Sequence, residues 1–257
     1  MKNLVILLYC LFCFNAVAQY EAFQALKYTD SKGTVLNYRL LLPPDYNPNN
    51  KYPLILFLHG GGERGDDNIS QLKYGSEMFL NKSKETPFIG IFPQCAKEDY
   101  WASVKFSRAK YPLELDFNYT YPENPSLHAA VELVQSMIKG KKADKKRIFI
   151  TGMSMGGMGT FEAVYRYPKL FAAAAPICGG ADLNAYSKTQ AKVPFRIYHG
   201  DVDGVIPVKH SREATEKLKA LGCDVVYKEY PGVNHNSWDN VFKEPDYLTW
   251  LLAQKKK

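Results

Sequence analysis

Ser154 is the residue of this 257-residue chain whose surroundings most clearly indicate chemistry. It lies at the centre of the run GMSMG (152–156), directly after the apolar run RIFI (147–150). A serine in a tight turn from a strand into a helix needs strained backbone geometry, and flanking glycines remove the Cβ atoms that would clash there. The pattern therefore predicts an exposed nucleophilic hydroxyl. An ordinary glycine-rich turn is the alternative, but the apolar run before the serine and the small residues after it favour the nucleophile.

A serine hydroxyl attacks poorly unless a base removes its proton, and His235 is the best-placed base. It lies in the segment PGVNHNSW (231–238), a loop after the last predicted strand, from which a side chain can reach across to Ser154. The other four histidines lie at strand ends or within helical patterns, where structural, packing or surface roles are more common: His59, His128, His199 and His210.

The base needs an acid to orient it and to stabilise the imidazolium. Asp201 and Asp203 both follow the predicted strand at 193–200, and the chain order Ser, Asp, His fits either one. We favour Asp203, which lies deeper in the loop and immediately ahead of the next helix. Asp201 is expected to cap the turn.

The oxyanion that forms during attack at a carbonyl needs fixed N–H donors. One should be the backbone N–H of Met155, next after the serine. The other should come from HGGGERG (59–65), where glycines permit close backbone approach. We favour Gly61, with Gly62 as the second choice.

The elements that position these residues follow from apolar runs that alternate with helix-like stretches. Strands are expected at 35–42 (an edge strand), 54–60, 88–93, 147–152, 171–180, 193–200 and 224–232, and helices at 125–140, 156–168, 208–222 and 240–254, the last interrupted by Pro245. This alternation predicts an α/β fold with a mostly parallel sheet and helices on both faces. Ligands bind beyond the carboxyl ends of the strands in such sheets, where the candidate residues gather.

An aromatic-rich segment at 95–124 follows one of these strand ends and has neither a helical nor a strand period. Long irregular segments in compact domains are commonly functional or disordered, and disordered segments are poor in aromatic residues. We expect this one to fold over Ser154 and to offer aromatic faces to a sugar or phenolic ring. Trp101 is expected nearest to the substrate, with Tyr100 and Trp238 as further contacts. Packing of the aromatic residues onto the domain is the alternative.

The N-terminus has the pattern of a secretory signal peptide over residues 1–18. Lys2 precedes the apolar run LVILLYCLFCF, and Ala16-Val17-Ala18 forms a small-residue cleavage site. The apolar run is shorter than the roughly 20 residues of a spanning helix. We therefore expect export, to the periplasm or beyond, of a single domain that begins near Gln19, without a membrane anchor. Of five cysteines, three remain after cleavage, and an exported chain could oxidise one pair of them: Cys95, Cys178 and Cys223.

Composition adds little about partners. The net charge of +7 is concentrated in KGKKADKKR (139–147) and in the last three lysines. Such runs are usually solvated surface, and no nucleic-acid motif accompanies them. No Cys/His cluster has metal spacing, so no metal and no cofactor are expected. The sequence carries no indication of an oligomeric state.

Four ordered motifs together carry a resemblance to a known family: LHGGGERGDDN, GMSMGGMGT, HGDVDGVIPV and PGVNHNSW. They resemble the α/β-hydrolase superfamily, and more closely the secreted bacterial esterases of the dienelactone-hydrolase and feruloyl-esterase-like group, whose members are often labelled predicted peptidases or phospholipase/carboxylesterases. The resemblance extends over nearly all of residues 25–254. It implies Ser154 as nucleophile, Asp203 as acid and His235 as base. It does not imply a substrate, because this fold serves many reactions.

Taken together, these observations predict a serine carboxylic-ester hydrolase that forms an acyl-enzyme, acting on a small-molecule or polysaccharide-linked ester, with acetyl or feruloyl esters of plant polysaccharides as candidates. A serine peptidase is the first alternative. The chain length argues against it, because prolyl-oligopeptidase-like enzymes carry a large extra domain that restricts access, and 257 residues leave no length for one. A non-catalytic binding protein on the same fold is the second alternative, and the complete set of catalytic residue types argues against it.

Overall fold

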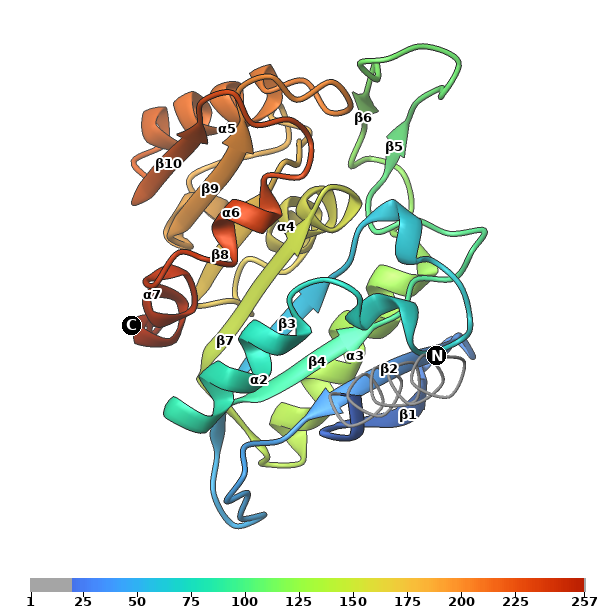
Figure 1. Ribbon diagram of the computed structural model, residues 1–257, viewed down its shortest axis with the longest axis vertical. Helices are drawn as coiled ribbons and strands as arrows, with labels where there is room; N and C mark the ends of the chain where they lie inside the picture. The colour runs from blue at the N-terminus through green and yellow to red at the C-terminus, as the bar shows by residue number, and fades with distance from the viewer. Residues whose placement is uncertain (1–19, 257) are drawn as a thin grey trace, which may run out of the picture.

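The computed structural model describes residues 20–256, so the predicted signal peptide lies outside the described residues. Eight strands form one sheet in the order β1-β2-β4-β3-β7-β8-β9-β10 (Figure 1). In chain order the strands of this sheet are β1 (Phe23–Thr29), β2 (Val35–Leu41), β3 (Tyr52–Leu58), β4 (Ile89–Pro93), β7 (Ala143–Met153), β8 (Ala173–Ile177), β9 (Phe195–Gly200) and β10 (Val225–Tyr230).

The six strands from β4 to β10 in that order are parallel, and β2 joins them antiparallel to β4, with β1 antiparallel to β2 at the edge. The predicted mostly parallel sheet is therefore confirmed. The strand predicted at 35–42 is not an edge strand, however, because β1 pairs outside it. The central strands β3 and β4 are buried along their whole length, as expected of strands covered on both faces.

Helices cover both faces of the sheet. The α-helices are α2 (Ser76–Glu85), α3 (Pro125–Lys139), α4 (Met155–Arg166), α5 (Lys209–Ala220), α6 (Trp238–Val241) and α7 (Tyr247–Ala253). Apolar residues of α3, α4 and α5 share one hydrophobic core, and those of α2, α6 and α7 share a second core on the opposite face. The predicted closing helix is divided into α6 and α7 around Pro245, as expected. Among the described helices, none combines the length and the apolar character of a membrane span.

Short 3₁₀-helices and one small hairpin lie outside the main sheet. Three turns of 3₁₀-helix are η1 (Gly61–Glu63), η2 (Ser70–Leu72) and η3 (Gln190–Lys192). The segment 95–124, for which no regular structure is predicted, contains a two-stranded hairpin of β5 (Val104–Lys105) and β6 (Asp116–Phe117). Figure 1 shows this hairpin projecting beyond the sheet at the end where β7 leads into α4.

The strand order reverses at β3, because the chain runs from β3 outward to β4 and then returns to β7 on the other side of β3. A crevice forms at such a switch point beyond the carboxyl ends of the strands. The loop that begins at Gly60 leaves β3 there, and Ser154 leaves β7 there. The fold thus places the glycine-rich loop beside the serine turn.

Candidate active site

Ser154 occupies a strained turn between β7 and α4. Its φ is 55° and its ψ is −117°, a conformation that non-glycine residues rarely adopt. The turn is held by the Ser154 N–H, which donates to Ile177 O at 2.9 Å. The flanking glycines are sterically required: a Cβ on Gly156 would lie 1.9 Å from Leu58 O, and one on Gly152 would lie 2.5 Å from Gly156 O. The glycines of the GMSMG pattern are therefore needed for the predicted reason: any Cβ at these two positions would clash in the turn.

Ser154, His235 and Asp203 form one hydrogen-bonded chain. The Ser154 hydroxyl lies 2.9 Å from His235 Nε2, and His235 Nδ1 lies 2.8 Å from Asp203 Oδ2. A carboxylate only accepts, so Nδ1 carries the proton and Nε2 is free to accept from the serine. The structure thus brings together the three residues that the sequence predicts as a triad.

Asp203 is a buried carboxylate that accepts four hydrogen bonds. Its Oδ1 accepts from the N–H groups of Val205 at 2.8 Å and Ile206 at 2.9 Å. Its Oδ2 accepts from His235 and also from His199 Nε2 at 3.1 Å. Burial by itself raises the pKa of Asp203, but the hydrogen bonds from the two histidines outweigh it and hold the pKa well below its usual range. Asp203 is therefore an anion at neutral pH and accepts the hydrogen bond from the Nδ1–H of His235.

Asp201 lies outside this chain of hydrogen bonds. Its Oδ1 accepts from the Gly232 N–H at 2.6 Å and so joins the turn after β9 to the loop after β10. This is the turn-stabilising role expected of it. It also holds the loop that carries His235.

His59 has a structural role at the start of the glycine-rich loop. Its Nδ1–H donates to Gly60 O at 2.7 Å, and its Nε2 accepts from the Cys95 N–H at 3.0 Å. Burial lowers the pKa of His59 to about 4. The ring is therefore neutral at pH 7 and joins the loop after β3 to the segment after β4.

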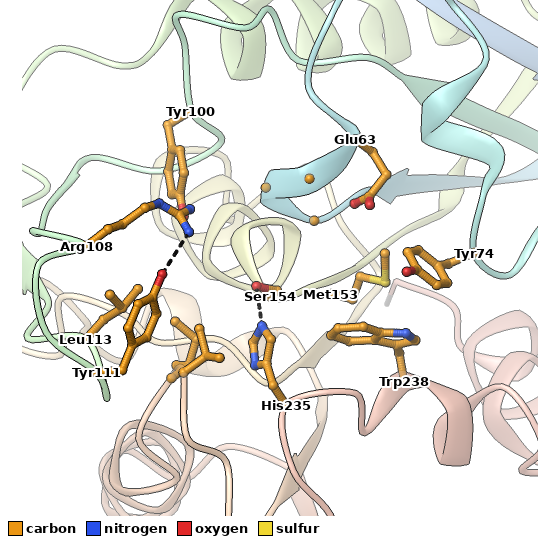
Figure 2. A pocket seen from close by; sticks show the side chains of 15 residues that line it. Glu63, Tyr74, Tyr100, Arg108, Tyr111, Leu113, Met153, Ser154, His235 and Trp238 are labelled. Carbon is orange, nitrogen blue, oxygen red and sulfur yellow. Dashed lines mark hydrogen bonds between the residues drawn. The ribbon is translucent and has the colours of Figure 1, made fainter.

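A cavity of about 340 Å³ opens over Ser154 (Figure 2). Gly61 and Gly62 of η1 line it together with the serine. The N–H of Met155 is among the first N–H groups of α4, which have no partner within their own helix. The three residues predicted to stabilise an oxyanion therefore lie at or beside the cavity. The residues that line it are Gly60, Gly61, Gly62, Glu63, Tyr74, Tyr100, Arg108, Tyr111, Leu113, Met153, Ser154, Val205, Ile206, His235 and Trp238.

The prediction for Trp101 is wrong. Its side chain is fully buried and does not line the cavity. The indole packs edge-on against His59, with ring centroids 5.3 Å apart, and its Nε1–H donates to His59 O at 3.2 Å. It also lies against α4, since a Cβ on Gly159 would be 2.5 Å from Trp101 Cβ. The residue therefore packs the segment onto the domain, which was the alternative.

The other two predicted contacts, Tyr100 and Trp238, do line the cavity. The aromatic-rich segment folds over Ser154 as expected, but it contributes Tyr100, Arg108 and Tyr111 in place of Trp101. Sequence reasoning missed Glu63 and Tyr74, although Glu63 is part of the HGGGERG motif and follows its glycines directly.

One thiol, that of Cys178, lies close to the side chains of Asp203 and His235. The three cysteines of the described chain are free, so no disulfide joins them. Cys178, Asp203 and His235 present ligand atoms within 4.8 Å of one another. Burial raises the pKa of the Cys178 thiol strongly, which keeps it protonated, and the Asp203 and His235 atoms are already hydrogen-bonded to each other. A metal there would have to replace the hydrogen bond that orients His235.

Comparison with known proteins adds family relationships to this geometry. The model of a family described as Phospholipase/Carboxylesterase matches residues 47–246. A carboxylesterase of Arabidopsis thaliana is 28% identical over 213 residues, which span 79% of this chain and 90% of the relative. Feruloyl esterase D of Neurospora crassa is 25% identical over 197 residues, which span 76% of this chain and 63% of the relative.

Among solved structures, a thermostable esterase superimposes with a TM-score of 0.82 and 32% identity over 93% of this chain. The chain spans 64% of the length of that esterase. This likeness confirms the predicted α/β-hydrolase fold. A puromycin-hydrolysing peptidase has a TM-score of 0.63 at 14% identity, a likeness that extends to the fold alone.

Proposed function

Because the chain belongs to the phospholipase/carboxylesterase family of α/β-hydrolases and is a carboxylic-ester hydrolase, we propose that it works through an acyl-enzyme formed on Ser154. The observation that carries this proposal is the unbroken hydrogen-bonded chain from the Ser154 hydroxyl through His235 to Asp203, in which Ser154 and His235 line the cavity. The serine lies in the strained turn that exposes a hydroxyl, and the histidine is oriented by a buried anion.

Acylation begins when His235 Nε2 accepts the hydroxyl proton as Ser154 Oγ attacks the ester carbonyl carbon. The resulting imidazolium is stabilised by Asp203, 2.8 Å away. Nε2 then returns the proton to the alcohol oxygen, the bond between the carbonyl carbon and that oxygen breaks, and the alcohol leaves. Water repeats these steps on the acyl-enzyme, which releases the acid and restores the serine.

The oxyanion of each tetrahedral intermediate is held by the backbone N–H of Met155 and that of Gly61, with Gly62 as the alternative donor. Met155 opens α4, so the positive end of the helix dipole adds to its N–H. Gly61 lies in η1 on the wall of the same cavity. Removal of a single oxyanion donor in other hydrolases costs about 10²–10³ in kcat, so each of these N–H groups is expected to contribute a factor of that size.

For the substrate, we propose acetyl or feruloyl esters attached to plant polysaccharides, met outside the cytoplasm after cleavage of residues 1–18. Relatives named as a feruloyl esterase and as an acetylxylan esterase/xylanase support this choice. The test is a panel of acetylated xylan, methyl ferulate and a peptide amide, each with the wild-type protein and with Ser154→Ala. Turnover of an ester that is lost in Ser154→Ala supports the proposal. Turnover of the amide alone would favour the peptidase.

A further inference from the structure

The cavity has two chemically different sides. Figure 2 shows Glu63, Tyr74 and Trp238 on one side of Ser154, and Tyr100, Arg108 and Tyr111 on the other. We call these the Glu63 side and the Arg108 side. His235 and Ser154 lie between them. An ester bound at Ser154 must direct its acyl part and its alcohol part toward different walls, so the two sides can distinguish the two parts.

Glu63 is an unusual residue to find on such a wall. Only 7% of the surface of Glu63 is exposed to solvent. Within residues 20–256, no Lys, Arg or His forms an ion pair with it. Burial raises its pKa, and the charge of Lys73 and the nearby backbone N–H groups offset this only in part. A buried carboxyl group without a cation is costly unless hydrogen-bond donors satisfy it. The backbone N–H groups of Gly60 and Glu63 satisfy part of this need, and a ligand in the cavity can supply further donors.

Trp238 supplies an aromatic face to the same side. Its Nε1 is buried and has no partner among the described residues. Its ring packs edge-on against His235, with centroids 5.3 Å apart, and against Tyr74 at 5.6 Å. Tyr74 adds a second aromatic ring. The Glu63 side thus offers a carboxyl acceptor and aromatic surface within one wall.

A ring that carries several hydroxyl groups fits this combination. A hydroxyl can donate to Glu63, and the C–H face of the ring can lie on the aromatic surface. A carboxylate ligand would be repelled by Glu63. A purely apolar alcohol would cover the carboxyl group of Glu63 without giving it a donor, which carries a desolvation cost.

The position of His235 indicates which part of the ester occupies this side. The alcohol oxygen receives its proton from His235 Nε2, so the alcohol begins beside the imidazole. Trp238 is the cavity residue whose ring contacts that imidazole. The alcohol therefore extends along Trp238 toward Glu63, and the acyl group extends toward the Arg108 side.

We infer that Glu63 and Trp238 select the alcohol part of the substrate, and that they bind a neutral polyol such as a sugar ring, with a hydroxyl next to the ester oxygen donating to Glu63. This inference rests on the proposed function. It assigns specificity residues that neither the triad nor the family relationship supplies.

The test compares two acetates that differ by a single hydroxyl group: the monoacetate of trans-cyclohexane-1,2-diol and cyclohexyl acetate. The wild-type enzyme is expected to prefer the diol ester by roughly tenfold or more in kcat/KM, since hydrogen bonds to charged groups have about that effect. Glu63→Met removes both acceptor oxygens at similar volume, and the preference should fall to nearly one. Glu63→Gln keeps one acceptor oxygen and should retain part of the preference for the diol ester. Trp238→Phe narrows the aromatic face and should lower kcat/KM for both ring esters, with little effect on their ratio.

Matched controls are Glu77→Gln on α2 and Trp250→Phe on α7, both outside the lining of this cavity, and each should keep the wild-type preference. Labelling of each variant by a fluorophosphonate probe shows whether Ser154 is still assembled for attack. A wild-type enzyme that is labelled and hydrolyses both acetates at equal kcat/KM overturns the inference and leaves the proposed function standing. So does a Glu63→Met variant that is labelled at the wild-type rate and keeps the full preference. Absence of both labelling and ester hydrolysis in the wild type overturns the proposed function itself.

Discussion

At the scale of single residues, the triad shows which roles local sequence can indicate. The glycine spacing around Ser154 reflects a local steric need, so the serine turn could be predicted from five consecutive residues. Asp203 and His235 could be predicted because each follows a strand whose end must lie at the same edge of the sheet. Trp101 could not be placed correctly, because an aromatic residue near a strand end is equally suited to a cavity wall or to a core. Only tertiary contacts with His59 and α4 decide between them.

The choice between the two aspartates can be tested directly. Asp203→Asn removes the anion that orients His235, and by analogy with other triads kcat should fall about 10⁴-fold. Asp201→Asn is the matched control, because its carboxylate accepts only from the Gly232 N–H. Its kcat should fall far less. Steady-state kinetics on an acetyl ester measures both. A larger loss in Asp201→Asn would move the acid to that position.

Trp101 is expected to act on stability instead of substrate binding. Trp101→Ala removes a fully buried indole and its hydrogen bond to His59 O. Such truncations cost about 3–5 kcal/mol in the free energy of unfolding. Urea denaturation of the variant and of Trp250→Phe as a control measures the difference. A variant with unchanged stability and a raised KM for bulky esters alone would return Trp101 to the substrate.

At the scale of elements, the site depends on loops that meet from different strands. The turn after β7 presents Ser154, the loop after β3 presents Gly61, and the loop after β10 presents His235. The strands β3, β4, β7 and β8 could be predicted from apolar runs, and β9 and β10 from shorter stretches rich in β-branched and aromatic residues. Strand β1 could not, because most of its residues face solvent at the edge and lack an apolar pattern. The hairpin of β5 and β6 has only two residues in each strand, too few for a period to be recognised.

His59 links the glycine-rich loop to the segment after β4, and this link should weaken in acid. The pKa of His59 is about 4 in the folded protein, against about 6.5 in an unfolded chain. Between these two pH values the unfolded state binds the extra proton. The contribution of His59 to the free energy of unfolding is therefore fully present above about pH 6.5 and is lost as the pH drops toward 4. Burial also lowers the pKa of His210 to about 4, so it contributes in the same direction.

Thermal unfolding between about pH 7 and pH 4 tests this link. The melting temperature of the wild type should fall across that window, and His59→Gln, which cannot titrate there, should show a shallower fall. The double variant with His210→Gln should be shallower still. A His59→Gln profile as steep as the wild-type profile would mean that the ring is not held neutral by its surroundings.

At the scale of the whole molecule, the sheet separates the catalytic edge from a basic edge. Ser154 lies at the carboxyl end of β7, whereas the lysine-rich run begins at the amino end of the same strand. The prediction placed this run before the strand, but β7 begins earlier, at Ala143, and includes part of the run. The separation still holds, because the strand between the two ends is eleven residues long. A strand of that length extends about 35 Å, several Debye lengths at physiological salt.

The basic edge should therefore have little influence on catalysis. Replacing Lys141, Lys142, Lys145 and Lys146 together with glutamine should change kcat/KM for a neutral acetyl ester by no more than about twofold, even at low salt. Arg108, which lies in the cavity, provides the contrasting variant, and Arg108→Gln is expected to change KM. A large fall in kcat/KM for the quadruple lysine variant would show that the basic edge takes part in binding.

The central claim is that Ser154 is the nucleophile of an acyl-enzyme, and the most direct measurement is the site of covalent labelling. The wild-type protein is treated with a fluorophosphonate and digested, and the modified peptide is identified by mass spectrometry. We predict one adduct, on Ser154, with parallel loss of ester hydrolysis, and no adduct in Ser154→Ala. Labelling at another residue, or an active enzyme that remains unlabelled at Ser154, would contradict the claim.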